Sequence, residues 1–319
     1  MFRELDDLAD STWALAVLAA SAECGLLASI SAPATAEEAS EQAGMSVDLA
    51  RRMLDVLVAL DFAHRPGDEY VAAEAVRPML TPDGLLQLRA DLRTTFLQSR
   101  DLVDRAERHT LAPGWVHTDP HVLHAQGDSG RAAAHALAEQ GILRLAGLAD
   151  RLSAPTASFL DVGTGVGVIA IEMCHAYPQL RVVGLEPAQA PRREAIERVA
   201  DAGLSDRIDI RAQALEALTD VECFDLAYVP QVFLPDEAFR SGIPLVWRAL
   251  RPGGWVTLPV ISAPGNDLGA ALARLRNTLW GGGARFADEV AEAITRAGFI
   301  DVQVRHVGRT GSAIAGRRP

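Results

Sequence analysis

The sequence predicts an α/β chain: a Rossmann-like, doubly wound sheet of seven strands, preceded by an α-helical domain of the winged-helix kind. Two observations carry this prediction. From residue 157 onward, short apolar segments alternate with helical ones, which is typical of a parallel sheet covered on both faces. The length of 319 residues is enough for about two domains.

The elements of the sheet domain follow from hydrophobic periodicity. The expected strands are 157–162, 180–186, 207–212, 223–229, 254–260, 299–307 and 310–316. The expected helices lie near 167–177, 191–202, 236–250 and 287–297. Apolar and polar residues alternate after residue 300, which predicts a half-exposed strand there.

The N-terminal domain is expected to span residues 1–95. Residues 11–29 are apolar nearly all round and predict a buried helix. A capping box at Thr35 and Glu38 starts a short helix, and Ser46 can cap the next. The turn 64–69 then precedes a short strand. Helix, turn, helix and hairpin in this order predict a winged helix.

Residues 96–152 are predicted to be a helical linker that lines a substrate pocket, and residues 153–319 the sheet domain. The linker contains an aromatic and polar loop around Trp115. A single helix is expected over 129–152, with its apolar stripe centred on Leu137.

Charge excludes several functions. The net charge is −12, which disfavours nucleic acid as the main partner. Up to residue 95 there are 16 acidic residues and 7 arginines, a net of −9, so the winged helix is expected to serve dimerisation rather than DNA binding. The chain contains no lysine, which excludes chemistry that needs a Schiff-base or P-loop lysine.

The remaining composition points to a cytoplasmic protein without metal or membrane. No apolar run is long enough to span a membrane, and no secretory leader is recognisable. The three cysteines are far apart and form neither a zinc spacing nor a disulfide framework. The linker histidines His117, His121 and His124 lack the carboxylate–histidine spacing of a catalytic metal site.

The segment 159–167 organises the chain. It follows the pattern D-x-G-x-G-x-G, with Asp161, Gly163, Gly165 and Gly167 between a predicted strand and a predicted helix. Such glycines let the backbone approach a ligand, and a helix N-terminus favours negative charge. About 20 residues later the next strand ends at Glu186, where a carboxylate can accept hydrogen bonds from ribose hydroxyls.

The other strand ends are expected to join the same crevice, because ligands of open α/β sheets lie beyond the carboxyl ends of the strands. Pro187 is expected beside an adenine and Gln213 at its edge. The remaining predicted cofactor-side residues follow the third and fourth strands: Ala214, Leu215, Tyr228, Val229 and Pro230. A dinucleotide fingerprint needs glycine where Val168 stands, which disfavours an NAD-dependent oxidoreductase.

On these motifs the chain resembles the class I S-adenosylmethionine (SAM) dependent small-molecule methyltransferases with an N-terminal winged-helix dimerisation domain. This family includes plant phenolic O-methyltransferases and bacterial antibiotic-tailoring enzymes. The matching segments are 161–167, Glu186, 224–228 and 250–254, and the linker around Trp115 also fits. The resemblance implies SAM as cofactor, a small and aromatic secondary metabolite as acceptor, and a homodimer.

Two departures concern the site. Ala214 stands where the family usually has an aspartate that contacts the adenine. The segment 229–235 lacks the histidine that O-methylating members carry after the fourth strand.

The residues expected on the substrate side are Trp115, His121, His124, Gln231 and Phe233. His135 and Glu139 lie four residues apart on one predicted helical face. They form either a general base with its orienting acid or an ordinary solvated pair.

Three functional hypotheses remain open. The first is methyl transfer to an oxygen, nitrogen or activated carbon. The second retains SAM but uses its sulfonium as an electrostatic catalyst of a rearrangement or decarboxylation, because the family histidine is missing. The third is a winged-helix regulator that senses a small ligand.

Overall fold

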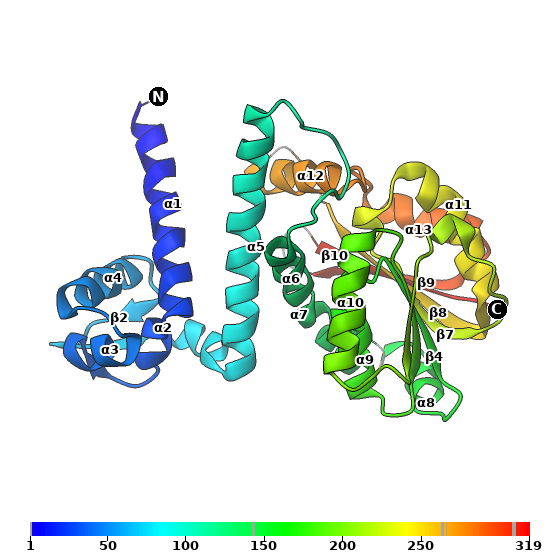
Figure 1. Ribbon diagram of the computed structural model, residues 1–319, viewed down its shortest axis with the longest axis horizontal. Helices are drawn as coiled ribbons and strands as arrows, with labels where there is room; N and C mark the ends of the chain where they lie inside the picture. Colours follow the sequence, from blue (N-terminus) through cyan, green and yellow to red (C-terminus); the bar gives the residue numbers. More distant parts are fainter. Residues whose placement is uncertain (1, 142–143, 263–264, 266, 308–310) are drawn as a thin grey trace. The chain divides into compact units, whose positions relative to one another are not determined.

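The computed structural model describes residues 2–141, 144–262, 265, 267–307 and 311–319. It divides the chain into two compact units, residues 1–101 and 102–319. Helix α5 (Pro82–Glu107) runs across this boundary. No helix among the described residues is both long and apolar enough to cross a membrane. Figure 1 shows the elements of both units.

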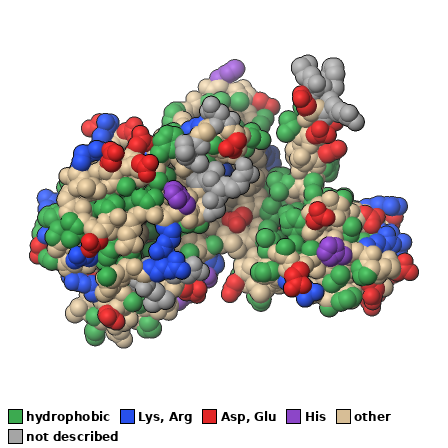
Figure 2. Space-filling model, turned by 180° about the vertical axis from the view of Figure 1, so that it is seen from behind, with side chains coloured by type: hydrophobic (Ala, Val, Ile, Leu, Met, Phe, Trp, Pro, Cys, Tyr) green, Lys and Arg blue, Asp and Glu red, His purple; other side chains and the backbone are tan. Residues whose placement is uncertain are grey.

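The N-terminal unit is mainly helical, with a small antiparallel sheet in the order β1-β3-β2. Its core gathers around Leu26, Leu54, Leu57 and Tyr70, all at most 1% exposed. Its elements are α1 (Phe2–Glu23), α2 (Leu26–Ser29), β1 (Ala34–Thr35), α3 (Ala36–Ala43), α4 (Val47–Ala59), β2 (Ala63–His64), β3 (Glu69–Ala72) and the 3₁₀ helix η1 (Glu74–Leu80). On the face in Figure 2, acidic side chains are spread over this unit among apolar ones.

The capping signals predicted for this unit are present, but the helix predicted over 11–29 differs in bounds and burial: α1 begins at Phe2, and its Trp13 is 73% exposed. The capping box is present, since Thr35 accepts from the Glu38 N–H and its own N–H donates to the Glu38 carboxylate at 2.8 Å. Ser46 caps α4. The prediction of one helix over 11–29 is wrong, because Gly25 adopts a left-handed φ of 85° and separates α1 from α2.

The C-terminal unit contains the predicted seven-stranded sheet, in the order β6-β5-β4-β7-β8-β10-β9. The first five of these strands pair in parallel, and β10 is antiparallel to both β8 and β9. The edge strand β9 is more exposed than the half-buried strand that was predicted. The strands are β4 (Ser158–Val162), β5 (Arg181–Leu185), β6 (Ile208–Arg211), β7 (Phe224–Tyr228), β8 (Leu250–Ile261), β9 (Ile300–Val307) and β10 (Gly311–Arg317).

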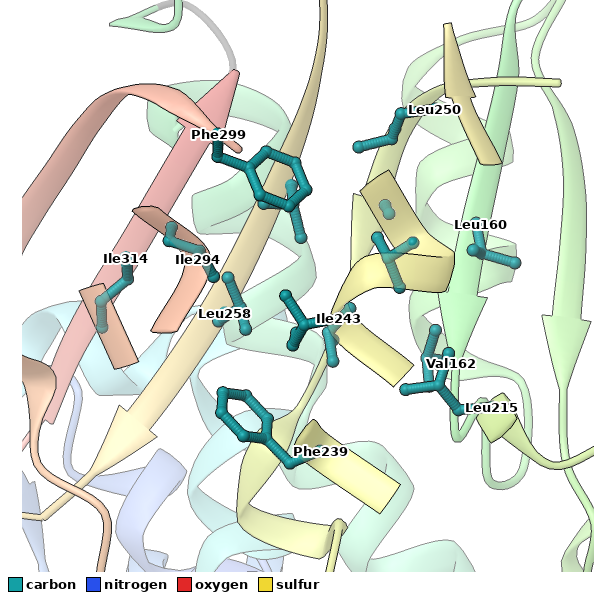
Figure 3. Packing of buried hydrophobic residues seen from close by; sticks show 14 of the residues in the cluster. Leu160, Val162, Leu215, Phe239, Ile243, Leu250, Leu258, Ile294, Phe299 and Ile314 are labelled. Atoms are coloured by element: carbon teal, nitrogen blue, oxygen red, sulfur yellow. The ribbon is translucent and has the colours of Figure 1, made fainter. Parts of the chain in front are cut away.

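Two hydrophobic layers cover this sheet. On one face Leu152, Met173 and Val199 pack from α8 (Leu148–Leu152), α9 (Val168–Ala176) and α10 (Gln189–Asp201). On the other face α11 (Asp236–Ala249) and α13 (Ala287–Arg296) contribute Ile243 and Ile294, which Figure 3 shows packed toward the strands. Both faces are therefore buried, as a doubly wound sheet requires.

Two helical predictions need correction. The prediction of one helix over 129–152 is wrong. Helix α6 (Pro120–Ser129) ends there, and α7 (Arg131–His135), the π-helix η2 (Ala136–Gly141) and α8 follow as separate elements. Residues 142 and 143 lie outside the described part. Gly147 directly precedes α8 and has a φ of 72°. A right-handed helix cannot run through a residue in this left-handed conformation. The sequence reading also missed α12 (Leu268–Trp280), although Asp267 caps it by accepting the Ala270 N–H at 3.1 Å.

Candidate functional site

The turn between β4 and α9 explains the three alternating glycines. Gly163, Gly165 and Gly167 have φ values of 64°, 58° and 81°, in the left-handed region that residues with a Cβ seldom adopt. A Cβ built on Gly165 would meet nothing closer than 3.9 Å, so conformation rather than crowding requires glycine there. The N–H of Thr164 donates to Leu185 O at 3.0 Å, which ties the turn to the end of β5.

Two carboxylates flank this turn. Asp161 is 1% exposed and accepts a hydrogen bond from Thr164 Oγ1 at 2.6 Å. Burial raises the pKa of Asp161 to about 7, and the hydrogen bond from Thr164 opposes that rise. Glu186 follows β5 and accepts the N–H of Gly165 at 3.1 Å and of Ala188 at 2.9 Å. Burial also raises the pKa of Glu186, and these two backbone N–H groups act in the opposite direction.

Glu186 can still bind hydroxyl groups. Each of its oxygens accepts one backbone N–H, and a carboxylate has about four lone-pair sites. The left-handed glycines allow a ligand to approach the backbone closely. Among the described residues, this edge of the sheet thus offers the acceptors and the close backbone approach that a nucleoside requires.

The predicted residues at the end of β7 divide into two groups. Tyr228 is 8% exposed, and burial, with Asp161 nearby, raises the pKa of its hydroxyl. Pro230 lies beside the turn, since a Cβ on Gly163 would be 3.9 Å from Pro230 Cγ. Val229 is fully buried in the hydrophobic core. Tyr228 and Pro230 therefore lie near the turn, whereas Val229 supports it from within.

The segment after β6 is arranged differently from the expectation. Gln213, predicted at an adenine edge, donates its side-chain amide to Ala217 O at 2.6 Å within its own loop. Ala214 precedes the 3₁₀ helix η4 (Leu215–Ala217), and Leu215 is buried in the core. The structure thus places Leu215 in the scaffold rather than on a ligand-facing surface.

A buried clamp holds the 3₁₀ helix η5 (Gln231–Phe233), which follows β7. Gln231 is 1% exposed; its Nε2 donates to Pro259 O at 3.3 Å and its Oε1 accepts from Arg285 at 2.7 Å. The Arg285 guanidinium also donates to Gln231 O at 2.9 Å and to Leu234 O at 2.6 Å, and it lies 4.4 Å from the Phe239 ring centroid. Sequence reading missed Arg285, because no local pattern marks it.

Four aromatic rings contact one another in a row: His117, Trp115, Phe233 of η5 and Trp280. Phe233 stacks on Trp280 with centroids 5.3 Å apart and an interplanar angle of 30°. Trp115 meets Phe233 edge to face at 5.3 Å, and His117 meets Trp115 in the same manner at 4.5 Å. The row joins the linker loop, η5 and the end of α12. The structure therefore brings together the predicted residues Trp115 and Phe233 and adds Trp280, which lies on the helix that the sequence reading missed.

The other predicted linker residues point to carboxylates of the sheet domain or to solvent. His124 Nε2 lies 2.9 Å from Glu194 Oε2 on α10, and His135 Nε2 lies 3.1 Å from Glu172 Oε2 on α9. His121 is exposed in the first turn of α6. The predicted pairing of His135 with Glu139 is corrected: the chain changes to a π-helix after His135, which alters the four-residue spacing, and Glu139 is exposed.

Helix α6 lies directly on the glycine turn. A Cβ on Gly127 would come within 2.2 Å of Val166 Cγ2, so a larger residue there would displace the Val166 side chain. Leu123 of α6 packs with Val166 and Val168 in a small buried cluster. The pair Asp128–Arg198, at 2.6 Å, attaches the end of α6 to α10.

A cavity of about 460 Å³ opens between the linker loop and the start of α10. Its volume lies in the range of small-molecule sites. Its lining residues are Trp115, Val116, His117, Thr118, Ala188, Gln189, Ala190, Pro191 and Arg193.

Comparison with known proteins agrees with this geometry. Residues 159–254 match the family model described as a methyltransferase domain. Demethylmenaquinone methyltransferase of Deinococcus radiodurans is 30% identical over 132 residues, which make up 41% of this chain and 54% of that protein. The chain spans about half the length of the curated relatives it matches, or less.

Solved structures extend the likeness to the whole chain. An O-methyltransferase family protein from Burkholderia thailandensis has a TM-score of 0.68 at 17% identity, covering 100% of this chain and 98% of that one. Human N-acetylserotonin methyltransferase in complex with SAM has a TM-score of 0.65 at 19% identity, with 99% and 97% covered.

The sheet order, the glycine turn and the two carboxylates define the class I methyltransferase fold. Residues 159–254 match the model of a methyltransferase domain, and over its full length the chain has the fold seen in solved O-methyltransferase structures. The α/β fold class inferred from the sequence is confirmed, and so is the resemblance to methyltransferases for residues 159–254.

Proposed function

We propose that this chain transfers the methyl group of SAM to a small aromatic acceptor. The observation that carries the proposal is the arrangement of Asp161, the left-handed glycines and Glu186 at adjoining strand ends within a methyltransferase domain. Bound SAM supplies an activated methyl group on a sulfonium. The protein must then hold the two reactants in line and exclude water.

Residue roles follow from position. Glu186 accepts the ribose hydroxyls, and the turn from Asp161 to Gly167, together with Tyr228 and Pro230, surrounds the methionine part. Pro187 and Ala188 lie against the adenine. We therefore retain these residues as proposed contacts of the cofactor. Val229 and Leu215 are buried in the hydrophobic core and support the site without touching the ligand.

The acceptor is proposed to lie against the aromatic side chains Trp115, Phe233 and Trp280. Flat rings favour stacked and edge-to-face contact with one another, which supports an aromatic acceptor. The clamp of Arg285 and Gln231 keeps Phe233 in place. The Gln231 amide is engaged at both ends and therefore serves the wall rather than the acceptor.

The segment 229–235, directly after β7, contains no histidine, and this limits the acceptor's chemistry. His124 and His135 are each engaged with a carboxylate of the sheet domain. We therefore propose an acceptor whose nucleophile needs no enzymic base, such as an acidic phenol that is ionised at neutral pH, or an amine.

The same feature favours one alternative. A segment after β7 without a histidine is also compatible with a reaction in which bound SAM stabilises charge and is not consumed.

The N-terminal unit is proposed to be a winged-helix-like dimerisation module. Helix α1 exposes large apolar side chains, with Leu5, Leu8 and Trp13 exposed by 63%, 61% and 73%. Solvated apolar side chains along one helix favour burial against a second copy. The division into residues 1–95, 96–152 and 153–319 is kept as part of this proposal.

The test is a product assay with a panel of phenols of graded acidity and aromatic amines. The protein is incubated with SAM and each compound, and S-adenosylhomocysteine is quantified by mass spectrometry. We expect stoichiometric S-adenosylhomocysteine and a product heavier by one methylene. Turnover of a panel compound without S-adenosylhomocysteine would instead establish the non-methylating alternative. Glu186→Gln should reduce product formation, and Glu197→Gln, on the exposed side of α10, is the control.

A further inference from the structure

The cavity of about 460 Å³ adjoins the Glu186 carboxylate. Ala188 lines the cavity, and its N–H donates to Glu186 Oε1 at 2.9 Å. The cavity therefore begins two residues beyond the carboxylate proposed to hold the ribose. A base attached to that ribose would extend into it.

The two walls of the cavity differ in chemistry. The inner wall, at the start of α10, carries the small apolar side chains of Ala188, Ala190 and Pro191 beside the polar Gln189 and Arg193. The outer wall carries the rings of Trp115 and His117 from the linker loop. A lining that combines aromatic rings with small apolar side chains suits a flat heteroaromatic ring, because every nucleobase offers a face for stacking.

The outer wall is supported from behind. Trp115 contacts Phe233 edge to face at 5.3 Å, and Phe233 stacks on Trp280. The Arg285 clamp fixes η5 and thereby Phe233. A wall held in this way loses little conformational freedom when a ligand binds.

The residue expected at the adenine edge is engaged elsewhere. Gln213 donates its amide to Ala217 O at 2.6 Å, and Ala214 has no side chain that can reach a base edge. The loop after β6 thus contributes less to an adenine site than the sequence suggested.

From these observations we propose that Trp115 and His117 form the outer wall of the adenine site. The linker loop, which the sequence assigned to the acceptor, would then serve both ligands: Trp115 faces the cofactor cavity and touches Phe233 of the acceptor wall. Binding of the cofactor thereby sets the position of the acceptor's aromatic surroundings. This inference rests on the proposed function, since it takes the cofactor to be SAM.

Tryptophan fluorescence during titration with S-adenosylhomocysteine tests the proposal. Stacking of the adenine on Trp115 should quench part of the emission of the native chain. Trp115→Phe should abolish most of that quenching, because it removes the indole. Trp115→Ala should weaken binding about tenfold by calorimetry, in line with the usual contribution of base stacking on an aromatic side chain. Trp247→Phe is the matched control, because Trp247 lies on α11 and donates to Gly298 O. We expect it to retain both quenching and affinity.

Two further variants separate the wall from its support. His117→Ala should weaken binding severalfold. Phe233→Ala leaves the cavity lining intact but removes the support of Trp115, so it should reduce both quenching and affinity.

The outcomes are distinct. Native-level quenching in Trp115→Phe together with native-level affinity in Trp115→Ala would overturn this inference and leave the proposed function standing. No binding of S-adenosylhomocysteine to the native chain would overturn both.

Discussion

Gly165 donates its backbone N–H to Glu186 Oε2 at 3.1 Å, although the two residues are 21 positions apart. This contact joins the end of β5 to the middle of the glycine turn. Gly165 can present its N–H in this direction because its φ is 58°. The pairing links the two strongest sequence signals, the glycine pattern and the acid of the next strand, into one geometric unit.

Gly165→Ala should therefore impair both stability and ligand binding. A left-handed φ costs a residue with a Cβ about 1–2 kcal/mol, and we expect that loss in the free energy of unfolding. The affinity for S-adenosylhomocysteine should fall at least tenfold, because the N–H to Glu186 is displaced. Denaturant unfolding and calorimetry measure the two effects.

Gly203→Ala is the matched control for that variant. Gly203 also has a left-handed φ, 68°, but no neighbour lies within 4 Å of its Cβ position. We expect the same loss of stability with unchanged affinity. Equal affinity losses in both variants would show that the turn at Gly165 has no specific part in binding.

Asp161 should make stability depend on pH. Burial raises its pKa to about 7, from an ordinary value of 3.8. Between about pH 4 and pH 7 the unfolded chain is ionised at this position while the folded chain retains the proton, so Asp161 lowers stability as the pH rises through this window. The slope is at most about 1.4 kcal/mol per pH unit.

Asp161→Asn removes this dependence and retains an oxygen for the Thr164 hydroxyl. The stability of the variant relative to the native chain should rise between pH 5 and pH 7 and level off above it. Urea unfolding at several pH values measures this difference. Asp201→Asn, at an exposed position, is the control and should show no such trend. If the stability difference between Asp161→Asn and the native chain did not change with pH, burial would not raise the pKa of Asp161.

Arg285 should be important for stability. Its guanidinium is 11% exposed and serves two carbonyls, the Gln231 amide and Asp236. Arg285→Ala leaves these acceptors without their donor, so we expect a loss of about 2–4 kcal/mol in unfolding free energy.

Two related variants qualify this effect. Arg285→Lys retains the charge but not the fork geometry, and should recover only part of the loss. Arg296→Ala, in an exposed i,i+4 pair with Glu292, should cost about 0.5 kcal/mol or less. If Arg285→Ala lost no more unfolding free energy than this control, the hydrogen bonds of Arg285 would not contribute to stability.

His135→Ala should leave turnover within about twofold of the native value. The imidazole is bound to Glu172 on α9, and Arg131 binds the same carboxylate. Steady-state assays with an acceptor found in the panel would measure kcat and KM separately. A drop of tenfold or more in kcat at unchanged KM would return His135 to the mechanism as a base.

Local patterns predicted the sheet well and the linker poorly. The central strands could be located because they are short apolar runs, and the edge strand β9 because apolar and polar residues alternate along it. The glycine turn could be recognised because three left-handed positions, at alternate residues, require glycine. The helix over 129–152 was misjudged because apolar spacing alone does not reveal that α6 ends before Gly130 or that Gly147 adopts a left-handed φ before α8.

The site was predictable where it depends on one segment and not where it depends on contacts. Glu186 follows from its distance in sequence to the glycine turn. By contrast, Arg285 reaches Gln231 across 54 positions, and Trp280 contacts Phe233 from a helix that the sequence reading did not place. Likewise, only the fold brings Glu172 to His135 in place of Glu139.

The most direct test of the central claim is calorimetric titration of the native chain and Glu186→Ala with S-adenosylhomocysteine, and in parallel with NAD. The account predicts that the native chain binds S-adenosylhomocysteine and not NAD, and that Glu186→Ala weakens this binding at least tenfold. Absence of S-adenosylhomocysteine binding, or equal affinity in the two proteins, would contradict the assignment of this crevice as the cofactor site.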